Sequence, residues 1–207
     1  MEESANAAHS DPLSLTPEET DLLHHVASRL VESAALQRPV SISDFALGRL
    51  TDYPLVGVFV TLRNQGDLRG CIGNFAAATP LNTALERAAA GVVNHDPRFP
   101  AVTASELPDL TLTVSLLHTR ELLGTDAEQR AGQVIIGQHG LDLQFQGSTG
   151  LLLPSVATDF GLDAIGFLQA VCRKAGLPLD AWEDPAAVIY RFSAIVFGGP
   201  WIGSDAR

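Results

Sequence analysis

The stretch PLVGVFVTLRNQGDLRGCIG, residues 54–73, decides how this chain builds its sheet. Residues 55–62 are rich in β-branched and aromatic side chains, which favour strands. Asn64–Gly66 is typical of a turn, and 67–72 continues as a second strand. The stretch therefore predicts an antiparallel hairpin, around which we place the other elements.

A helix is predicted before this hairpin and another after it. Thr16 has the character of an N-cap residue, and Pro17 suits the first helical position. After the hairpin, Thr79 and Pro80 predict a second helix start in the same way. The residues LTLTVSLL, 110–117, alternate between apolar and polar, which predicts a strand with one solvated face.

The second half of the chain has a similar order of elements. QVIIG (133–137) and LDLQF (141–145) predict a hairpin, and Asp163 is expected to cap a helix over 163–175. AVIYRFSAIVF (187–197) predicts a long final strand. We therefore expect an α+β fold with antiparallel or mixed sheets, made of two similar strand–strand–helix–strand units plus an N-terminal helix.

The expected domain organisation is a single domain between two tails. Residues 1–14 are small, polar and acidic, and 198–207 follow the last predicted strand, so both are expected to be flexible tails. The domain spans 15–197 and consists of two intertwined halves, about 15–118 and 119–197.

Composition excludes several functional classes. The chain has 207 residues, a net charge of −11 and one lysine, Lys174, which argues against broad contacts with a nucleic-acid backbone. The N-terminus lacks the pattern of a secretory signal, and no apolar run approaches the ~18 residues of a membrane span. We expect a cytoplasmic protein whose two cysteines are free thiols.

Cys71 is the first candidate for chemistry. Strand alternation places Cys71 and Arg69 on the face opposite Leu68 and Ile72, and a neighbouring cation favours the nucleophilic thiolate. Gly70 and Gly73 would let a ligand approach the sulfur closely. The alternative is that the two glycines serve a bulge and Cys71 is a small buried filler.

Two further residues are interpreted from their local pattern. His139 is predicted to lie in a tight turn. It is there either because His tolerates unusual backbone angles or because it acts as a general acid or base with Cys71. Cys172 lies on the apolar stripe of the helix over 163–175, so we assign it to packing.

The loop NHDPRFP, residues 94–100, places the carboxylate of Asp96 two positions before the guanidinium of Arg98. Asp96 is expected to bind backbone amides and to pair with Arg98, whose guanidinium alternatively binds a carboxylate or phosphate of a ligand. No closely spaced cysteine pair, HExxH motif or phosphate-binding glycine loop occurs in the sequence. No metal site is therefore predicted, and no cofactor is identified.

Six motifs occur in a family-specific order: LRGCIG, DPRFP, SLL, GQHGL, GLLLPSVA and KAGLPLDAW. With these motifs the chain resembles the AMMECR domain family, also named AmmeMemoRadiSam system protein A, from about Pro17 to Phe197. Three departures are visible: Ser155 stands where the family usually has Gln, the Trp expected soon afterwards is missing from TDFGLDAI, and a His precedes DPRFP where other members vary. We keep Ser155 as a candidate binding residue.

The resemblance implies an α+β fold with two similar units and a functional association with a Memo-like protein and a radical SAM protein. Two functions follow as hypotheses. The first is a thiol-dependent enzyme or enzyme component that acts on a small molecule, with Cys71 as nucleophile or anchor, Arg69 as activator and His139 as acid or base. The second is a non-catalytic adaptor for partner proteins. A role in RNA modification is a weaker alternative.

Overall fold

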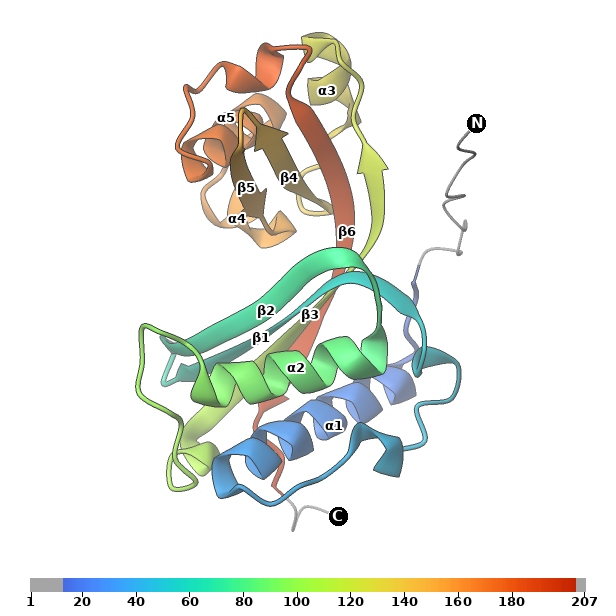
Figure 1. The fold of residues 1–207 in the computed structure, drawn as a ribbon, viewed down its shortest axis with the longest axis vertical. Helices are drawn as coiled ribbons and strands as arrows, with labels where there is room; N and C mark the ends of the chain where they lie inside the picture. The colour runs from blue at the N-terminus through green and yellow to red at the C-terminus, as the bar shows by residue number, and fades with distance from the viewer. Residues whose placement is uncertain (1–12, 204–207) are drawn as a thin grey trace.

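The computed structural model describes residues 13–203, which form one six-stranded sheet in the order β2-β1-β3-β6-β4-β5 (Figure 1). Every neighbouring pair of strands is antiparallel. The strands are β1 (Pro54–Asn64), β2 (Asp67–Pro80), β3 (Leu110–Leu122), β4 (His139–Phe145), β5 (Ser148–Leu152) and β6 (Val188–Pro200). Together with the helices they confirm the predicted α+β fold.

The helices cover the sheet in two groups. Helices α1 (Pro17–Leu36) and α2 (Leu81–Asn94) pack beneath β1 and β2, as Figure 1 shows. The other group consists of α3 (Ala127–Gln133), α4 (Pro154–Asp159) and α5 (Ala164–Lys174); α4 and α5 lie against β4 and β5, and α3 packs on α5. Short 3₁₀ turns occupy Ile42–Asp44, Gly48–Leu50, Leu107–Asp109 and Ala181–Glu183.

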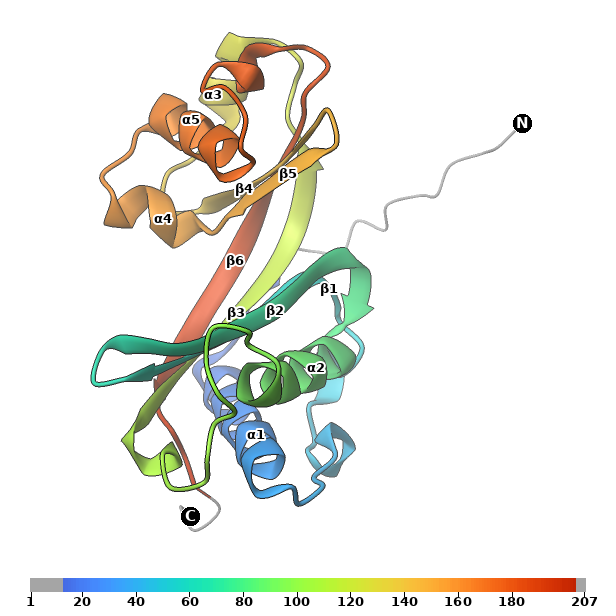
Figure 2. The same ribbon diagram turned by 60° about the vertical axis from the view of Figure 1, so that its left-hand side comes forward.

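These two groups divide the molecule into two lobes with separate cores. The first lobe is built on α1, α2, β1 and β2, and its core reaches from Leu13 to Leu116 and adds Phe197. The second lobe is built on α3, α4, α5, β4 and β5, with a core between Leu123 and Ile189. The long strands β3 and β6 run through both lobes and join them into one sheet (Figure 2).

Two of the predicted helix starts are confirmed by their cap geometry. The Thr16 side chain accepts a hydrogen bond from the Glu19 backbone N–H, and the Glu19 carboxylate accepts one from the Thr16 N–H. These reciprocal bonds satisfy amides that the first helical turn leaves without partners. Asp163 caps α5 in a similar way, by accepting from the Gly166 N–H.

The second predicted hairpin is wrong. Instead of pairing 133–137 with 141–145, the chain ends α3 at Gln133 and pairs β4 with β5. The turn of this hairpin is Gln146–Gly147, where both residues have positive φ, as Gln65 and Gly66 have in the first hairpin. Such φ values are what a two-residue turn between right-twisted strands requires. His139 is consequently the first residue of β4 and lies outside any hairpin turn.

The boundary between β2 and α2 and the exposure of β3 also differ from the expectation. Strand β2 continues to Pro80, so that α2 begins at Leu81 and Thr79 does not cap it. Strand β3 alternates in exposure only at its start, because the consecutive residues Val114 to His118 are all buried. Solvation of one face therefore holds only for the N-terminal part of this strand.

The expected tails overlap with ordered structure at both ends. Residues 1–12 and 204–207 lie outside the described residues, but Leu13 is buried in the core of the first lobe. At the other end, Gly198 pairs with Thr113 and Pro200 with Thr111, so β6 extends into the segment expected to be a tail. Over residues 13–203, the helices are all too short or too polar to cross a membrane.

Candidate functional site

Cys71 lies on β2, on the side of the sheet that faces away from α1 and α2. The Ile72 side chain packs against Gly91 of α2, so its neighbour Cys71 points to the other face. There Cys71 is paired with Thr61 of β1, and Thr61 is paired with Thr113 of β3. We call this side the open face and define it by Cys71, Thr61 and Thr113. All three residues are half-buried.

The sulfur of Cys71 has a hydroxyl group as its polar neighbour. Thr61 Oγ1 donates a hydrogen bond to Cys71 Sγ over 3.2 Å. The sequence predicts that Gly70 and Gly73 let a ligand approach the sulfur, but both glycines face closely packed neighbours. A Cβ at Gly70 would meet Val92 of α2, and a Cβ at Gly73 would meet the Phe59 ring at 2.5 Å. The glycines therefore allow close packing on both faces of β2.

The backbone of Cys71 is held by the DPRFP loop. Because β2 is at the edge of the sheet, the outward N–H and C=O of Cys71 have no partner strand. Asp96 Oδ2 accepts from the Cys71 N–H at 2.8 Å, and Arg98 Nη2 donates to the Cys71 carbonyl at 3.1 Å. Asp96 and Arg98 also pair with each other at 2.7 Å. We call Asp96 and Arg98 the edge clamp.

Electrostatics within the edge clamp favour the charged forms of both residues. Hydrogen bonds from the Arg98 side chain and from the Cys71 amide hold the pKa of the Asp96 carboxyl well below its ordinary value, against the opposing effect of burial. The same contacts with Asp96 raise the pKa of Arg98. The predicted pairing of Asp96 with Arg98 and with backbone amides is thus observed. One of these amides is that of Cys71, whose carbonyl is bound by Arg98.

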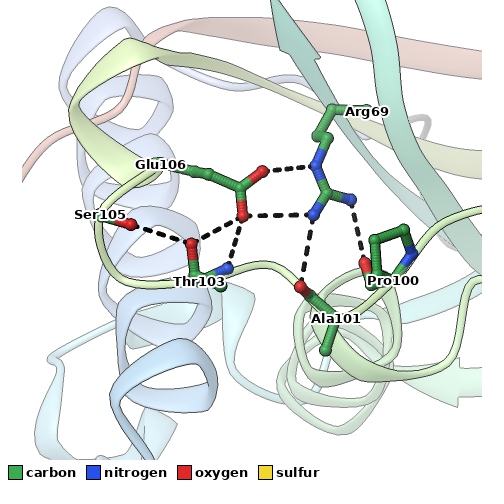
Figure 3. Close-up of polar contacts among 6 residues, drawn as sticks. All are labelled: Arg69, Pro100, Ala101, Thr103, Ser105 and Glu106. Carbon is green, nitrogen blue, oxygen red and sulfur yellow. Dashed lines mark hydrogen bonds and ion pairs between the residues drawn. The ribbon is translucent and has the colours of Figure 1, made fainter.

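Arg69 is bound to a loop, and it makes no hydrogen bond or ion pair with Cys71 among the described contacts. Its Nε donates to Glu106 Oε1 at 2.6 Å, and its remaining donors reach the carbonyls of Pro100 and Ala101 at 3.1 and 3.3 Å (Figure 3). The same Glu106 carboxylate accepts from the backbone and the hydroxyl of Thr103. These bonds, above all those from Arg69, lower the pKa of Glu106 to about 2.

A β-bulge explains why Arg69 departs from the predicted geometry. Leu62 pairs with Gly70 and Arg63 with Leu68, which leaves Arg69 as the additional residue on β2. The strict alternation assumed from the sequence is therefore interrupted between Leu68 and Gly70. Leu68, expected in the core, is 36% exposed.

His139 and Ser155 lie in the second lobe, away from the thiol. Strand β4, which begins with His139, is separated from β2 by β1, β3 and β6 in the sheet. His139 Nδ1 accepts a hydrogen bond from the Ile135 N–H at 3.0 Å, and burial together with Arg191 lowers the pKa of this imidazole. Ser155 is exposed on α4. The structure therefore brings Asp96 and Arg98 to Cys71, and it does not bring His139 or Ser155 there.

Cys172 lies in the core of the second lobe. Cys172 is fully buried in the second core, as predicted, and burial raises the pKa of its thiol. Within residues 13–203, no three His, Cys, Asp or Glu side chains come together in a way that could hold a metal ion. The chemistry available at the open face is that of a thiol beside a hydroxyl group.

Sequence reasoning missed Thr61 and Glu106. A hairpin with its turn at Gln65–Gly66 and no bulge would place Thr61 opposite Gly70, and the bulge shifts this partner to Cys71. Glu106 carries no motif signal, because it lies 37 residues after Arg69 and meets it only through the folding of the loop.

A second polar cluster lies where the two lobes meet. Arg120 of β3 forms an ion pair with the buried Asp142 of β4, and its guanidinium carbon lies 3.3 Å from the ring centroid of Tyr190 on β6. The same guanidinium lies 5.5 Å from the ring of Phe75 on β2. Phe75 belongs to the first lobe and Asp142 to the second, so Arg120 bridges the two lobes.

Comparison with known proteins agrees with this architecture. A crystal structure of an uncharacterised protein from Pyrococcus horikoshii, PH0010, superposes with a TM-score of 0.78 at 34% identity, over 90% of this chain and 95% of that one. A protein of Methanothermobacter thermautotrophicus is 45% identical over 142 residues, which are 68% of this chain and 74% of the relative. A protein of Methanocella arvoryzae is 40% identical over 167 residues, 77% of this chain and 84% of the relative. Residues 7–197 match the AMMECR1 family. The chain belongs to the AMMECR1 family.

Proposed function

We propose that this protein is a thiol-dependent enzyme or enzyme component that holds a small molecule against the open face. Cys71 is the nucleophile or covalent anchor in this proposal. The thiolate attacks an electrophilic carbon of the substrate, a sulfur–carbon bond forms, and the displaced group leaves with its bonding electrons. The thiol proton passes to solvent. We further propose that the protein works with a Memo-like protein and a radical SAM protein in a reducing cytoplasm.

The observation that supports this proposal most strongly is the fixed geometry of Cys71. The residue is half-buried and its sulfur accepts a hydrogen bond from Thr61, while both backbone polar groups that point away from the sheet are held by the edge clamp. A cysteine that only fills space needs no hydroxyl donor at its sulfur. Fixed positioning of a nucleophile is a general requirement of covalent catalysis.

One observation favours the second candidate, a non-catalytic adaptor. Arg69, Asp96, Arg98 and His139 are all engaged in contacts that stabilise loops or strand edges. A general base within hydrogen-bond distance of the sulfur is therefore not found among the described residues. In the adaptor role the open face would bind a partner protein through its shape, and Cys71 would be replaceable.

The experiment compares the full chain with Cys71→Ser and with the matched control Cys172→Ser. Each protein is co-expressed with the Memo-like and radical SAM proteins of the same system, purified, and its intact mass is measured. The proposal predicts an added mass that maps to the Cys71 peptide, is present in Cys172→Ser and is absent in Cys71→Ser. If no adduct forms and Cys71→Ser still binds both partners and supports the activity of the system, the adaptor function is correct instead.

A further inference from the structure

The second lobe contains a groove that the proposed function does not use. It holds about 480 Å³ between α4, α5 and the end of β5, within the range of small-molecule sites in proteins. Its apolar wall is formed by Leu152, Val156, Phe160, Leu162 and Ala170. Phe160 is 76% exposed, so its ring is accessible to a ligand in the groove.

One stripe of α5 forms the floor of this groove. Gly166, Gln169, Ala170, Arg173 and Lys174 follow one another at helical spacing and all line it. Gly166 and Ala170 keep the upper part of the stripe flat, and the cations stand at its C-terminal end. From Gly166 to Arg173 the helix rises about 10 Å. The groove thus has an apolar end and a cationic end about that far apart.

The two cations are free to bind a ligand. Arg173 and Lys174 are exposed, and neither side chain makes a hydrogen bond or ion pair with another described residue. Most other arginines of the described chain, such as Arg69 and Arg98, are paired with carboxylates. Lys174 is moreover the only lysine in a chain with a net charge of −11. A local positive charge of this kind selects for an anionic group.

Another groove of the second lobe has a similar volume, so volume alone does not determine which groove a ligand enters. That groove holds about 490 Å³ in the same lobe, but three of its lining residues are the acids Asp180, Glu183 and Asp184. An anionic ligand is repelled there and attracted to the groove on α5. Charge therefore decides which of the two grooves it enters.

From this geometry we propose that the groove between α4 and α5 binds a single soluble amphiphile, with an apolar body about 10 Å long and an anionic head group. The apolar body lies on Gly166 and Ala170 against Phe160 and Leu162. The head group, a carboxylate or a phosphate, is bound by Arg173 and Lys174. This site is independent of Cys71, because it lies in the other lobe and on other elements.

Binding is measured with the full chain by fluorescence of anilinonaphthalene sulfonate and by its displacement with decanoate, decyl phosphate or the neutral analogue decanol. We expect saturable binding with one site, displaced by either anion and at least about tenfold less effectively by decanol. The double variant Arg173→Gln, Lys174→Gln should weaken decanoate binding about tenfold or more. The matched control Arg87→Gln removes an exposed cation from α2 in the first lobe and should leave binding unchanged.

A second variant tests the apolar end of the groove. Ala170→Trp places an indole over the floor and should abolish binding, while thermal unfolding reports whether the fold is kept. The proposal is overturned if decanol competes as well as decanoate, if the double variant binds like the unaltered chain, or if only anionic vesicles and no monomeric amphiphile are bound. Cys71→Ser should bind decanoate like the unaltered chain. A failure of the amphiphile proposal can therefore be told apart from a failure of the proposed thiol function.

Discussion

At the scale of single residues, the chemistry of the open face depends on the pair of Cys71 and Thr61. The thiol is presented at a fixed position, and the hydroxyl of Thr61 is the side-chain group that forms a hydrogen bond with it. Arg69, which the sequence suggests for this task, is bound to Glu106 because it is the additional residue of a bulge. The rate at which Cys71 reacts should therefore depend on the exposure of its thiol and on the hydrogen bond from Thr61.

Thr61→Val tests the contribution of that hydroxyl. Valine keeps the shape and removes the donor, so alkylation of Cys71 by iodoacetamide at fixed pH should slow about fivefold, equivalent to one hydrogen bond of about 1 kcal/mol. Thr113→Val is the matched control, because Thr113 lies across from Thr61 on the same face. Its alkylation rate should match the unaltered chain. Equal rates in all three proteins would show that the hydroxyl has no part in the reactivity.

At the scale of elements, the edge strand β2 depends on a loop for partners. The edge clamp and the Arg69–Glu106 pair attach residues 96–106 to β2 where another strand would otherwise pair. Unpaired strand edges are prone to association with other chains, and covering them is a common remedy. The DPRFP motif is therefore explained by the backbone requirements of Cys71.

Removing the acid of the edge clamp should destabilise the protein. Asp96→Ala leaves the Cys71 amide and the Arg98 guanidinium without their acceptor, and we expect the free energy of unfolding to fall by about 2–3 kcal/mol. Urea unfolding measures this change. The control Asp52→Ala removes an exposed acid and should change the value by less than about 0.5 kcal/mol. A similar small loss in both variants would mean that the clamp is dispensable.

Glu106 makes stability depend on pH in a definite window. Its pKa in the folded protein is about 2 and its ordinary value is 4.5, so its contribution is complete above pH 4.5 and is lost as the pH falls towards 2. The difference in stability between the unaltered chain and Glu106→Gln should shrink across this window. The control Glu128→Gln removes an exposed carboxylate, and its effect on stability should be small. A difference between the unaltered chain and Glu106→Gln that does not change between pH 5 and about pH 2 would contradict the assignment.

The elements that could be predicted from the sequence are those with local signals. Thr16 with Glu19, and Asp163, mark helix starts through short-range hydrogen bonds, and both are confirmed. The second hairpin was mispredicted because Val134 to Ile136 resemble a strand, although Ile135 is 49% exposed and the segment is a turn after α3. The Gln–Gly dipeptide, present in both hairpin turns, was the better signal. Bulges and the Arg69–Glu106 contact depend on tertiary pairing and have no local signal.

At the scale of the whole molecule, the two lobes share β3 and β6 and meet around Arg120. Arg120→Ala leaves the buried Asp142 with only Gln144 as a side-chain partner and removes the contact with Phe75. We expect a loss of about 2–4 kcal/mol in the free energy of unfolding and faster hydrogen exchange in β4. The control Arg191→Ala breaks a more exposed pair with Glu121 and should cost about 1 kcal/mol or less. Equal losses in the two variants would contradict a bridging role for Arg120.

The two lobes also separate two proposed activities, a thiol on the open face of the first and an amphiphile site in the second. Two of the three departures from the family pattern, Ser155 and the missing Trp of residues 158–165, lie in α4 and the segment that leads into α5. Phe160 and Leu162 of this segment line the amphiphile groove.

The most direct test of the central claim is the alkylation rate of Cys71 compared with Cys172 and with glutathione in the same solution. Iodoacetamide is added to the folded chain, and peptide masses report each cysteine over time. We predict that Cys71 reacts at least as fast as glutathione while Cys172, fully buried, stays a thiol. If both cysteines are modified together, and only as fast as the protein unfolds, Cys71 is a structural residue and the proposed thiol function is wrong.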